Sequence, residues 1–93
     1  MNTGGINSME NSNLVKKVVS LIEEVSDVDL TEFDGFLHVS LVESGIDSLM
    51  ALELGVHLER TYGIRLTEED LTEMKNVQSI IELLKLKGIE DEA

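Results

Sequence analysis

Apolar residues recur at helical spacing in three stretches of this chain, at residues 14–26, 48–62 and 77–87. The first stretch contains several β-branched residues, which favour a strand. Its apolar and polar positions do not alternate, however, and we therefore predict a helix. A shorter helix is predicted from residue 67 to 74, because Thr67-Glu68-Glu69-Asp70 has the pattern of a capping box. The pattern thus predicts an all-α fold. Outside the 48–62 stretch, the expected core positions are Leu14, Val18, Leu21, Ile22, Val25, Leu71, Met74, Val77, Ile80, Ile81 and Leu84.

The stretch at residues 48–62 has two apolar sides rather than one. With roughly 100° of rotation per residue, the expected core stripe consists of Ala51, Leu54, Leu58 and Tyr62. The nearly opposite side carries Leu49, Leu52 and Val56, flanked by Glu53, Glu59 and Arg60. A helix needs only one apolar side to fold. The second patch is therefore either a contact surface for a partner or a surface that a loop or another helix covers.

The start of this stretch carries strong local signals. Asp47 is a preferred N-cap residue, and Gly45 allows a sharp chain reversal just before it. Ser48 is thus predicted on the first helical turn, where backbone N–H groups lack partners and the helix dipole is positive. Such an end suits a phosphate group, and an exposed hydroxyl there can carry a phosphodiester. Further boundary signals are the N-cap candidates Asn11, Ser12, Asn13 and Asn76, the C-cap Gly63 and the stop at Gly88.

A long connection, residues 27–44, separates the first two predicted helices. Structureless loops of this length are uncommon in compact domains unless they are functional. We expect Phe36 or Leu37, and then Leu41, to anchor it across the fold, and a short helical turn at residues 33–39. The ends differ in composition from the middle: we predict a disordered tail at residues 1–13, one folded domain at 14–88 and a frayed acidic end at 89–93.

The composition narrows the class of partner. The formal net charge is −12 in 93 residues, which argues against nucleic acid and anionic membrane and favours partners with basic surfaces. There is no Cys, so disulfides, thiolate metal sites and cysteine nucleophiles are excluded. No apolar run is long enough to cross a membrane and no secretory signal is present. We therefore expect a cytoplasmic monomer.

Ser48 is a poor candidate for a catalytic serine. A nucleophilic serine needs a base within hydrogen-bond reach and an oxyanion hole. His57 is nine residues further along the same predicted helix, too far to reach back, and the G-x-S-x-G motif is absent, although the loop residue His38 stays open as a base. The acidic cluster at residues 68–73 lacks the spacing of a calcium loop. We predict no catalytic residue and no metal site.

The segment Gly45-Ile46-Asp47-Ser48-Leu49 resembles the acyl carrier protein family, together with its peptidyl and aryl carrier relatives. In that family a D-S-L triplet opens the second helix of a four-helix bundle. The resemblance extends over residues 14–87 and includes Glu53-Leu54, Leu58-Glu59, Tyr62, Val77-Gln78 and Ile81. It implies a small four-helix bundle with a long loop between helices I and II and a short helix III.

The same resemblance implies a function. A phosphopantetheinyl transferase would attach 4′-phosphopantetheine to Ser48, with Asp47 capping the helix and presenting the serine. The arm would then hold acyl or aminoacyl groups as thioesters for loading and synthase enzymes with basic docking surfaces. Those partners would bind the second helix through Leu49, Leu52, Glu53, Val56, Glu59 and Arg60.

The subclass rests on the residues after the serine. Fatty-acid carriers usually have an acidic residue just after Ser-Leu, whereas this chain has Met50-Ala51, and Arg60 stands where those carriers tend to be acidic. The segment from Gly45 to Leu54 looks more like discrete carriers of polyketide or nonribosomal peptide pathways, with a fatty-acid carrier as the alternative. A second alternative is an unmodified helical adaptor that binds a partner through the patch at Leu49, Leu52 and Val56.

Overall fold

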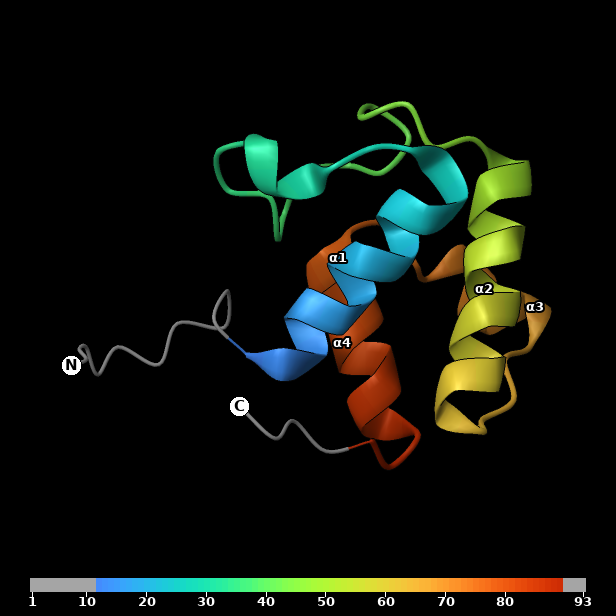
Figure 1. Cartoon of the computed structure of the whole chain (residues 1–93). Helices are drawn as coiled ribbons and strands as arrows, with labels where there is room; N and C mark the ends of the chain where they lie inside the picture. Colours follow the sequence, from blue (N-terminus) through green and yellow to red (C-terminus); the bar gives the residue numbers. More distant parts are fainter. Residues whose placement is uncertain (1–11, 90–93) are drawn as a thin grey trace, which may run out of the picture.

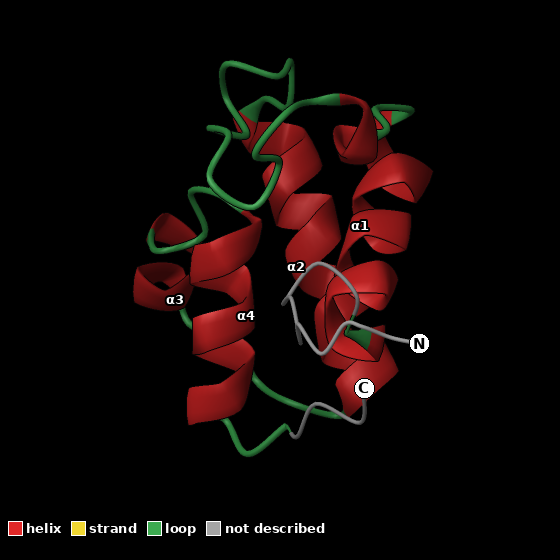
Figure 2. Cartoon of the chain, turned by 90° about the vertical axis from the view of Figure 1, so that its left-hand side faces the viewer, coloured by secondary structure: helices red, strands yellow, loops and turns green. Residues whose placement is uncertain are grey.

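The computed structural model describes residues 12–89, which fold into four α-helices and one short 3₁₀ helix. The helices are α1 (Asn13–Ser26), α2 (Ser48–Tyr62), α3 (Glu68–Thr72) and α4 (Val77–Leu86), and η2 (Leu30–Glu32) is the 3₁₀ helix. No strand occurs within residues 12–89. Helices α1, α2 and α4 lie side by side, and the α1–α2 loop crosses one end of them (Figures 1 and 2). The prediction of an all-α bundle with a short third helix is confirmed.

Each α-helix begins after a residue whose side chain caps it. The hydroxyl of Ser12 accepts a hydrogen bond from the backbone N–H of Val15 and caps α1. Asp47, Thr67 and Asn76 cap the other helices, the last two in reciprocal capping boxes. Side-chain oxygens at these positions bond N–H groups that have no partner inside the helix. The caps predicted for α2, α3 and α4 are therefore confirmed.

The ends of the helices are close to those predicted. Helix α2 ends at Tyr62 and is followed by the C-cap Gly63, which has φ of 66°, as expected of a glycine at this position. Helix α4 ends at Leu86, one residue earlier than expected. Helix α3 ends at Thr72 rather than near Met74, because the chain there turns to bury Met74, whose side chain is 5% exposed.

The core lies between α1, α2 and α4. Leu54 and Leu58 of α2 are fully buried, and Ala51 and Tyr62, the other members of the expected stripe, are half-buried. The predicted core positions of α1 and α4 are buried except Val25, which packs against the core while partly exposed. The pattern missed Val15 and Val19 of α1 and Leu83 of α4, which are also buried. A helix surrounded on more than one side buries a wider stripe than a simple amphipathic pattern indicates.

The long loop is anchored by buried aliphatic residues and by hydrogen bonds to α4. Leu37 and Leu41 are 8% and 2% exposed, as predicted, while Phe36 is half-buried. The N–H of Gln78 donates to the C=O of Leu37 at 2.9 Å, and the N–H of Leu41 donates to the C=O of Lys75 at 3.0 Å. Because its backbone is bonded across the bundle, this loop forms a fixed end of the molecule.

The helical piece in this loop lies earlier than predicted. Residues 34–38 form hydrogen-bonded turns, and the short helix is η2, at residues 30–32. The Asp29 carboxylate caps η2 by accepting from the Thr31 N–H at 3.0 Å, and Leu30 is fully buried. Capping and burial at these positions select the helical turn there.

The described residues extend slightly beyond the predicted domain. Ser12 is buried and Asn13 begins α1, while Ile89 packs against the core and its N–H donates to the C=O of Leu84. The assignments of residues 1–11 as a tail and of 90–93 as a frayed end lie outside the described residues. Within residues 12–89, no helix is long and apolar enough to cross a membrane.

Candidate functional site

Ser48 is the first residue of α2, and a tight turn places it there. Within this turn the N–H of Ile46 donates to the C=O of Leu41 at 2.9 Å, and the N–H of Gly45 donates to Val42 at 3.2 Å. Gly45 has φ of 106°, a backbone conformation that side chains disfavour. Ile46 is 2% exposed and holds the turn against the core. The next two residues, Asp47 and Ser48, are consequently exposed at the surface.

The backbone at this helix start is open toward solvent. Asp47 uses Oδ1 to accept from the N–H of Met50 at 2.9 Å, and its C=O accepts from the N–H of Ala51. The N–H groups of Ser48 and Leu49 have no hydrogen-bond partner among the described residues. Free N–H groups and the positive end of the helix dipole together favour an anion beside the Ser48 hydroxyl.

Two hollows adjoin Ser48. The first, about 530 Å³, lies between α2 and α3 and is mainly apolar, with a lining of Ser48, Leu49, Ala51, Leu52, Leu71 and Thr72. The second, about 550 Å³, lies between the α1–α2 loop and the α3–α4 linker. Its apolar floor includes Leu41, Ile46 and Met74, and its polar lining includes His38, Ser40, Asp47, Lys75 and Asn76. Both hollows are mainly apolar, and Ser48 lies at the edge that they share.

The second apolar side of α2 is uncovered. Leu49 is 66% exposed, Leu52 50% and Val56 39%, and Glu53 and Arg60 beside them are also exposed. No loop or helix of the described chain packs over this patch, which removes that alternative. Together Leu49, Leu52, Glu53, Val56 and Arg60 form one continuous face on α2, which we call the α2 face.

Glu59 differs from the other charged residues around the patch. It is half-buried, and its Oε2 accepts a hydrogen bond from the backbone N–H of Leu66 at 2.8 Å. This bond ties the end of α2 to the segment before α3. Glu59 therefore has a structural task besides any contact with a partner.

The histidines form no catalytic arrangement with Ser48. His57 Nδ1 lies 3.9 Å from Glu24 Oε1, which links α2 to α1. His38 lines the second hollow but makes no hydrogen bond to Ser48. The base that a nucleophilic serine requires is thus not positioned in the described structure.

The acidic cluster at α3 is organised by an ion pair. The Lys87 ammonium, which bonds Asp70 Oδ2 at 2.7 Å, holds the pKa of the Asp70 carboxyl below its ordinary value, and the Thr67 N–H contributes in the same direction. Within residues 12–89, no three His, Asp or Glu side chains are grouped as they would be around a metal ion. The cluster caps α3 and joins it to the end of α4.

Comparison with known proteins identifies the family. Residues 16–84 match the family described as "Phosphopantetheine attachment site". "Polyketide-8 synthase acyl carrier protein 2" of Streptomyces avermitilis is 40% identical over 67 residues, which cover 72% of this chain and 76% of that protein. The chain belongs to the acyl carrier protein family. Members of this family carry acyl groups rather than catalyse reactions, and they work with a phosphopantetheinyl transferase and with synthase enzymes.

Other relatives point the same way. "Anthracycline acyl carrier protein DpsG" of Streptomyces peucetius is 35% identical over 60 residues, covering 64% of this chain and 62% of that protein. "Non-reducing polyketide synthase dbaI" of Emericella nidulans is 32% identical over 72 residues, which are 77% of this chain but 3% of that synthase. No solved structure matched the chain.

The residues present fit the prosthetic group of this family. 4′-Phosphopantetheine needs an exposed hydroxyl for its phosphodiester, and a helix start with free N–H groups stabilises that charge. Ser48 and Leu49 provide both. Because the acyl carrier protein has no Cys, the arm supplies the thiol for thioesters.

Sequence reasoning missed three residues around Ser48: Ile46, Thr72 and Lys75. Ile46 carries the turn, and Thr72 and Lys75 line the hollows. No local pattern marks Ile46 as a core residue, and Thr72 and Lys75 come near Ser48 only through the tertiary fold.

Proposed function

We propose that Ser48 is the attachment residue for 4′-phosphopantetheine, and that the chain carries intermediates of polyketide assembly as thioesters on that arm. The observation that carries the proposal is the exposed Ser48 hydroxyl at a helix start whose N–H groups are free.

The other serines of the matched region support this choice. The hydroxyls of Ser26, Ser44 and Ser79 donate to backbone carbonyls. Ser40 accepts from the N–H of Glu43, and Ser20 lies inside α1, away from its free N–H groups. Ser48 alone among the serines at residues 16–84 combines an unengaged hydroxyl with a helix N-terminus.

The proposed attachment is a transfer from coenzyme A. The Ser48 hydroxyl would lose its proton and form a P–O bond to the pantetheine phosphate, while the P–O bond to adenosine 3′,5′-bisphosphate breaks. Asp47 would keep the helix start in place through its bond to the Met50 N–H, and the N–H groups of Ser48 and Leu49 would stabilise the new phosphodiester charge. The bound arm supplies a thiol that forms thioesters with acyl groups.

The α2 face is the proposed docking surface for partner enzymes. Leu49, Leu52 and Val56 offer apolar contact area beside Ser48, and Glu53 would pair with basic residues of the partner. Arg60 belongs to the same face, and Glu59, whose carboxylate also accepts from the Leu66 N–H, lies at its edge. Charges of this kind mainly set the encounter rate and the choice of partner.

The polyketide assignment draws support from the names of the more similar relatives. A fatty-acid carrier stays the second candidate, since a relative from Syntrophus aciditrophicus, 27% identical over 77 residues, is named only "Acyl carrier protein", with no pathway. The 40% identity to a polyketide synthase carrier favours the first. The cytoplasm is the compartment we propose, because coenzyme A must reach the site.

The test is the intact mass of the protein after incubation with coenzyme A, magnesium and a broad-specificity phosphopantetheinyl transferase. We expect the mass of one phosphopantetheine to be added to the wild type and to Ser44→Ala, and none to Ser48→Ala. Ser44→Ala is a matched control because it removes a hydroxyl four residues away. Addition to Ser48→Ala would disprove the attachment residue, and no addition with this or the host's transferase would favour the unmodified adaptor.

A further inference from the structure

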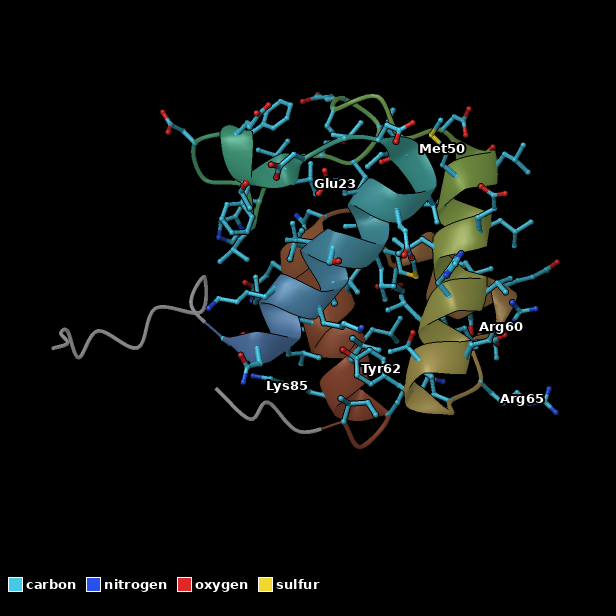
Figure 3. The ribbon with its side chains drawn as sticks, viewed as in Figure 1. Glu23, Met50, Arg60, Tyr62, Arg65 and Lys85 are labelled. Carbon is cyan, nitrogen blue, oxygen red and sulfur yellow. The ribbon has the colours of Figure 1, made fainter. Side chains whose placement is uncertain are left out.

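The acidic and basic side chains of this carrier are unevenly distributed. Between Lys17 and Arg60 the sequence has no Lys or Arg and ten Asp and Glu residues. Figure 3 shows Glu23 and Met50 toward one end of the bundle and Arg60, Arg65 and Lys85 toward the other. The end that carries Ser48 is therefore the acidic one, and a phosphodiester there adds negative charge where it is already concentrated.

One ammonium group lies at this acidic end. Lys75 belongs to the α3–α4 linker and is the one Lys or Arg in the linings of the two hollows beside Ser48. Its side chain is exposed and forms no ion pair among the described residues. Asp47 lines the same hollow, but its carboxylate caps α2 and does not pair with Lys75.

The backbone of Lys75 is fixed although its side chain is free. Its N–H donates to Ser79 Oγ at 2.9 Å, and its C=O accepts from the N–H of Leu41 at 3.0 Å. These bonds join the α3–α4 linker to the start of α4 and to the α1–α2 loop. The Cα of Lys75 therefore has a fixed position at the edge of the hollow beside Ser48.

From this arrangement we propose that Lys75 is a positioning residue for the prosthetic group. Its ammonium pairs with the phosphodiester on Ser48 and holds the phosphate end of the arm over the hollow between the α1–α2 loop and the α3–α4 linker. The inference rests on Ser48 being the attachment residue. The partners are complementary, since a lysine is a compact charge that binds phosphate oxygens. The free N–H groups of Ser48 and Leu49 bind the same anion from the helix side.

The experiment compares NMR spectra of the protein without and with the arm, after mass spectrometry has shown complete attachment. On attachment we expect shifts in the Lys75 side-chain ammonium resonance, in the backbone amides of Leu41 and Lys75, and in the amides of Ser48 to Met50. In Lys75→Gln the backbone amides of Leu41 and residue 75 should no longer shift on attachment. The amides of Ser48 to Met50 should shift as they do in the wild type. Lys75→Arg, which retains the charge, should keep both.

Lys85→Gln is the matched control, since it removes an exposed charge of α4 at the opposite end of the bundle (Figure 3). It should respond as the wild type does. Lys75→Gln should fold, because the hydrogen bonds at position 75 involve only its backbone. Identical shift patterns in the wild type and Lys75→Gln would overturn the role of Lys75 while leaving attachment intact. Absence of the added mass would instead remove the proposed function and this inference together.

Discussion

At the scale of single residues, α2 separates two tasks on its two sides. Leu54 and Leu58 are fully buried, whereas Leu52 of the same helix is 50% exposed. The first pair holds the helix in the bundle, and the exposed side can change without affecting the core. This separation allows folding and partner contact to be tested independently.

We predict that Leu54→Ala or Leu58→Ala lowers the free energy of unfolding by about 2–5 kcal/mol, because each leaves a cavity in the core. Leu52→Ala, the matched control, should change it by less than about 0.5 kcal/mol. Urea denaturation followed by circular dichroism measures both. A loss below about 0.5 kcal/mol for Leu54→Ala would show that the core side of α2 is assigned wrongly.

Gly45 and Asp47 set the backbone conformation at the start of α2. Gly45 supplies a φ of 106° and Asp47 supplies a cap, and both signals were readable in the sequence because each acts within a few residues. Ile46, which lies between them, was not recognised as a core residue. Its burial depends on the packing of the loop against the bundle, which local patterns do not report.

At the scale of elements, α3 is the least anchored helix. It spans five residues, Glu68–Thr72, none of which is fully buried. Leu71 packs close to Gly55 of α2, where an added Cβ would lie 2.6 Å from Leu71 Cδ2. The Lys87–Asp70 ion pair holds α3 to the end of α4. Since Leu71 and Thr72 line both hollows beside Ser48, the placement of α3 shapes that site.

This ion pair predicts a pH dependence. The folded-state pKa of Asp70 is lowered, so the pair contributes stability above the ordinary Asp pKa of about 3.9, and this contribution is lost as the pH falls through the lower folded value. Lys87→Gln should therefore have a lower Tm than the wild type at pH 7, and the two should converge in strong acid. Lys85→Gln, which breaks no observed ion pair, is the control. A constant difference down to about pH 2 would contradict the account.

The α2 face makes a second prediction for an element. Glu53→Lys should lower the kcat/KM of phosphopantetheine attachment by about five- to tenfold, the effect of roughly 1 kcal/mol of charge interaction. The fold should be unchanged, because Glu53 is exposed. Glu82→Lys makes the same charge change at an exposed position of α4, outside the acidic stretch between Lys17 and Arg60, and should leave attachment unaffected. Equal rates for both variants and the wild type would exclude Glu53 from the docking surface.

The sequence predicted the helices better than it predicted the loop between α1 and α2. Helices α1, α2 and α4 follow from the local apolar pattern. The caps of α2, α3 and α4, which are Asp47, Thr67 and Asn76, follow from capping chemistry. The loop was the weak point, because Leu30 and the helical turn at residues 30–32 are set by burial against α1 rather than by a repeating pattern. Lys75 is 27 residues after Ser48, and only the folded chain brings it to the same hollow.

At the scale of the whole molecule, the fold gathers its chemistry at one end. The α1–α2 loop, the start of α2 and the α3–α4 linker meet around Ser48, and the α1–α2 loop brings its acidic residues to this end. Such asymmetry orients a small protein as it approaches a basic partner, and salt weakens the effect. We therefore expect the carrier to approach its partners with the end that bears Ser48.

The most direct test of the account is to locate the added group. The protein treated with coenzyme A and transferase is digested, and tandem mass spectrometry of its peptides identifies the residue that carries phosphopantetheine. We expect one group per chain, on Ser48, with Ser40 and Ser44 unmodified. A group on any other residue, or an unmodified chain after treatment with the transferase of its own host, would contradict it.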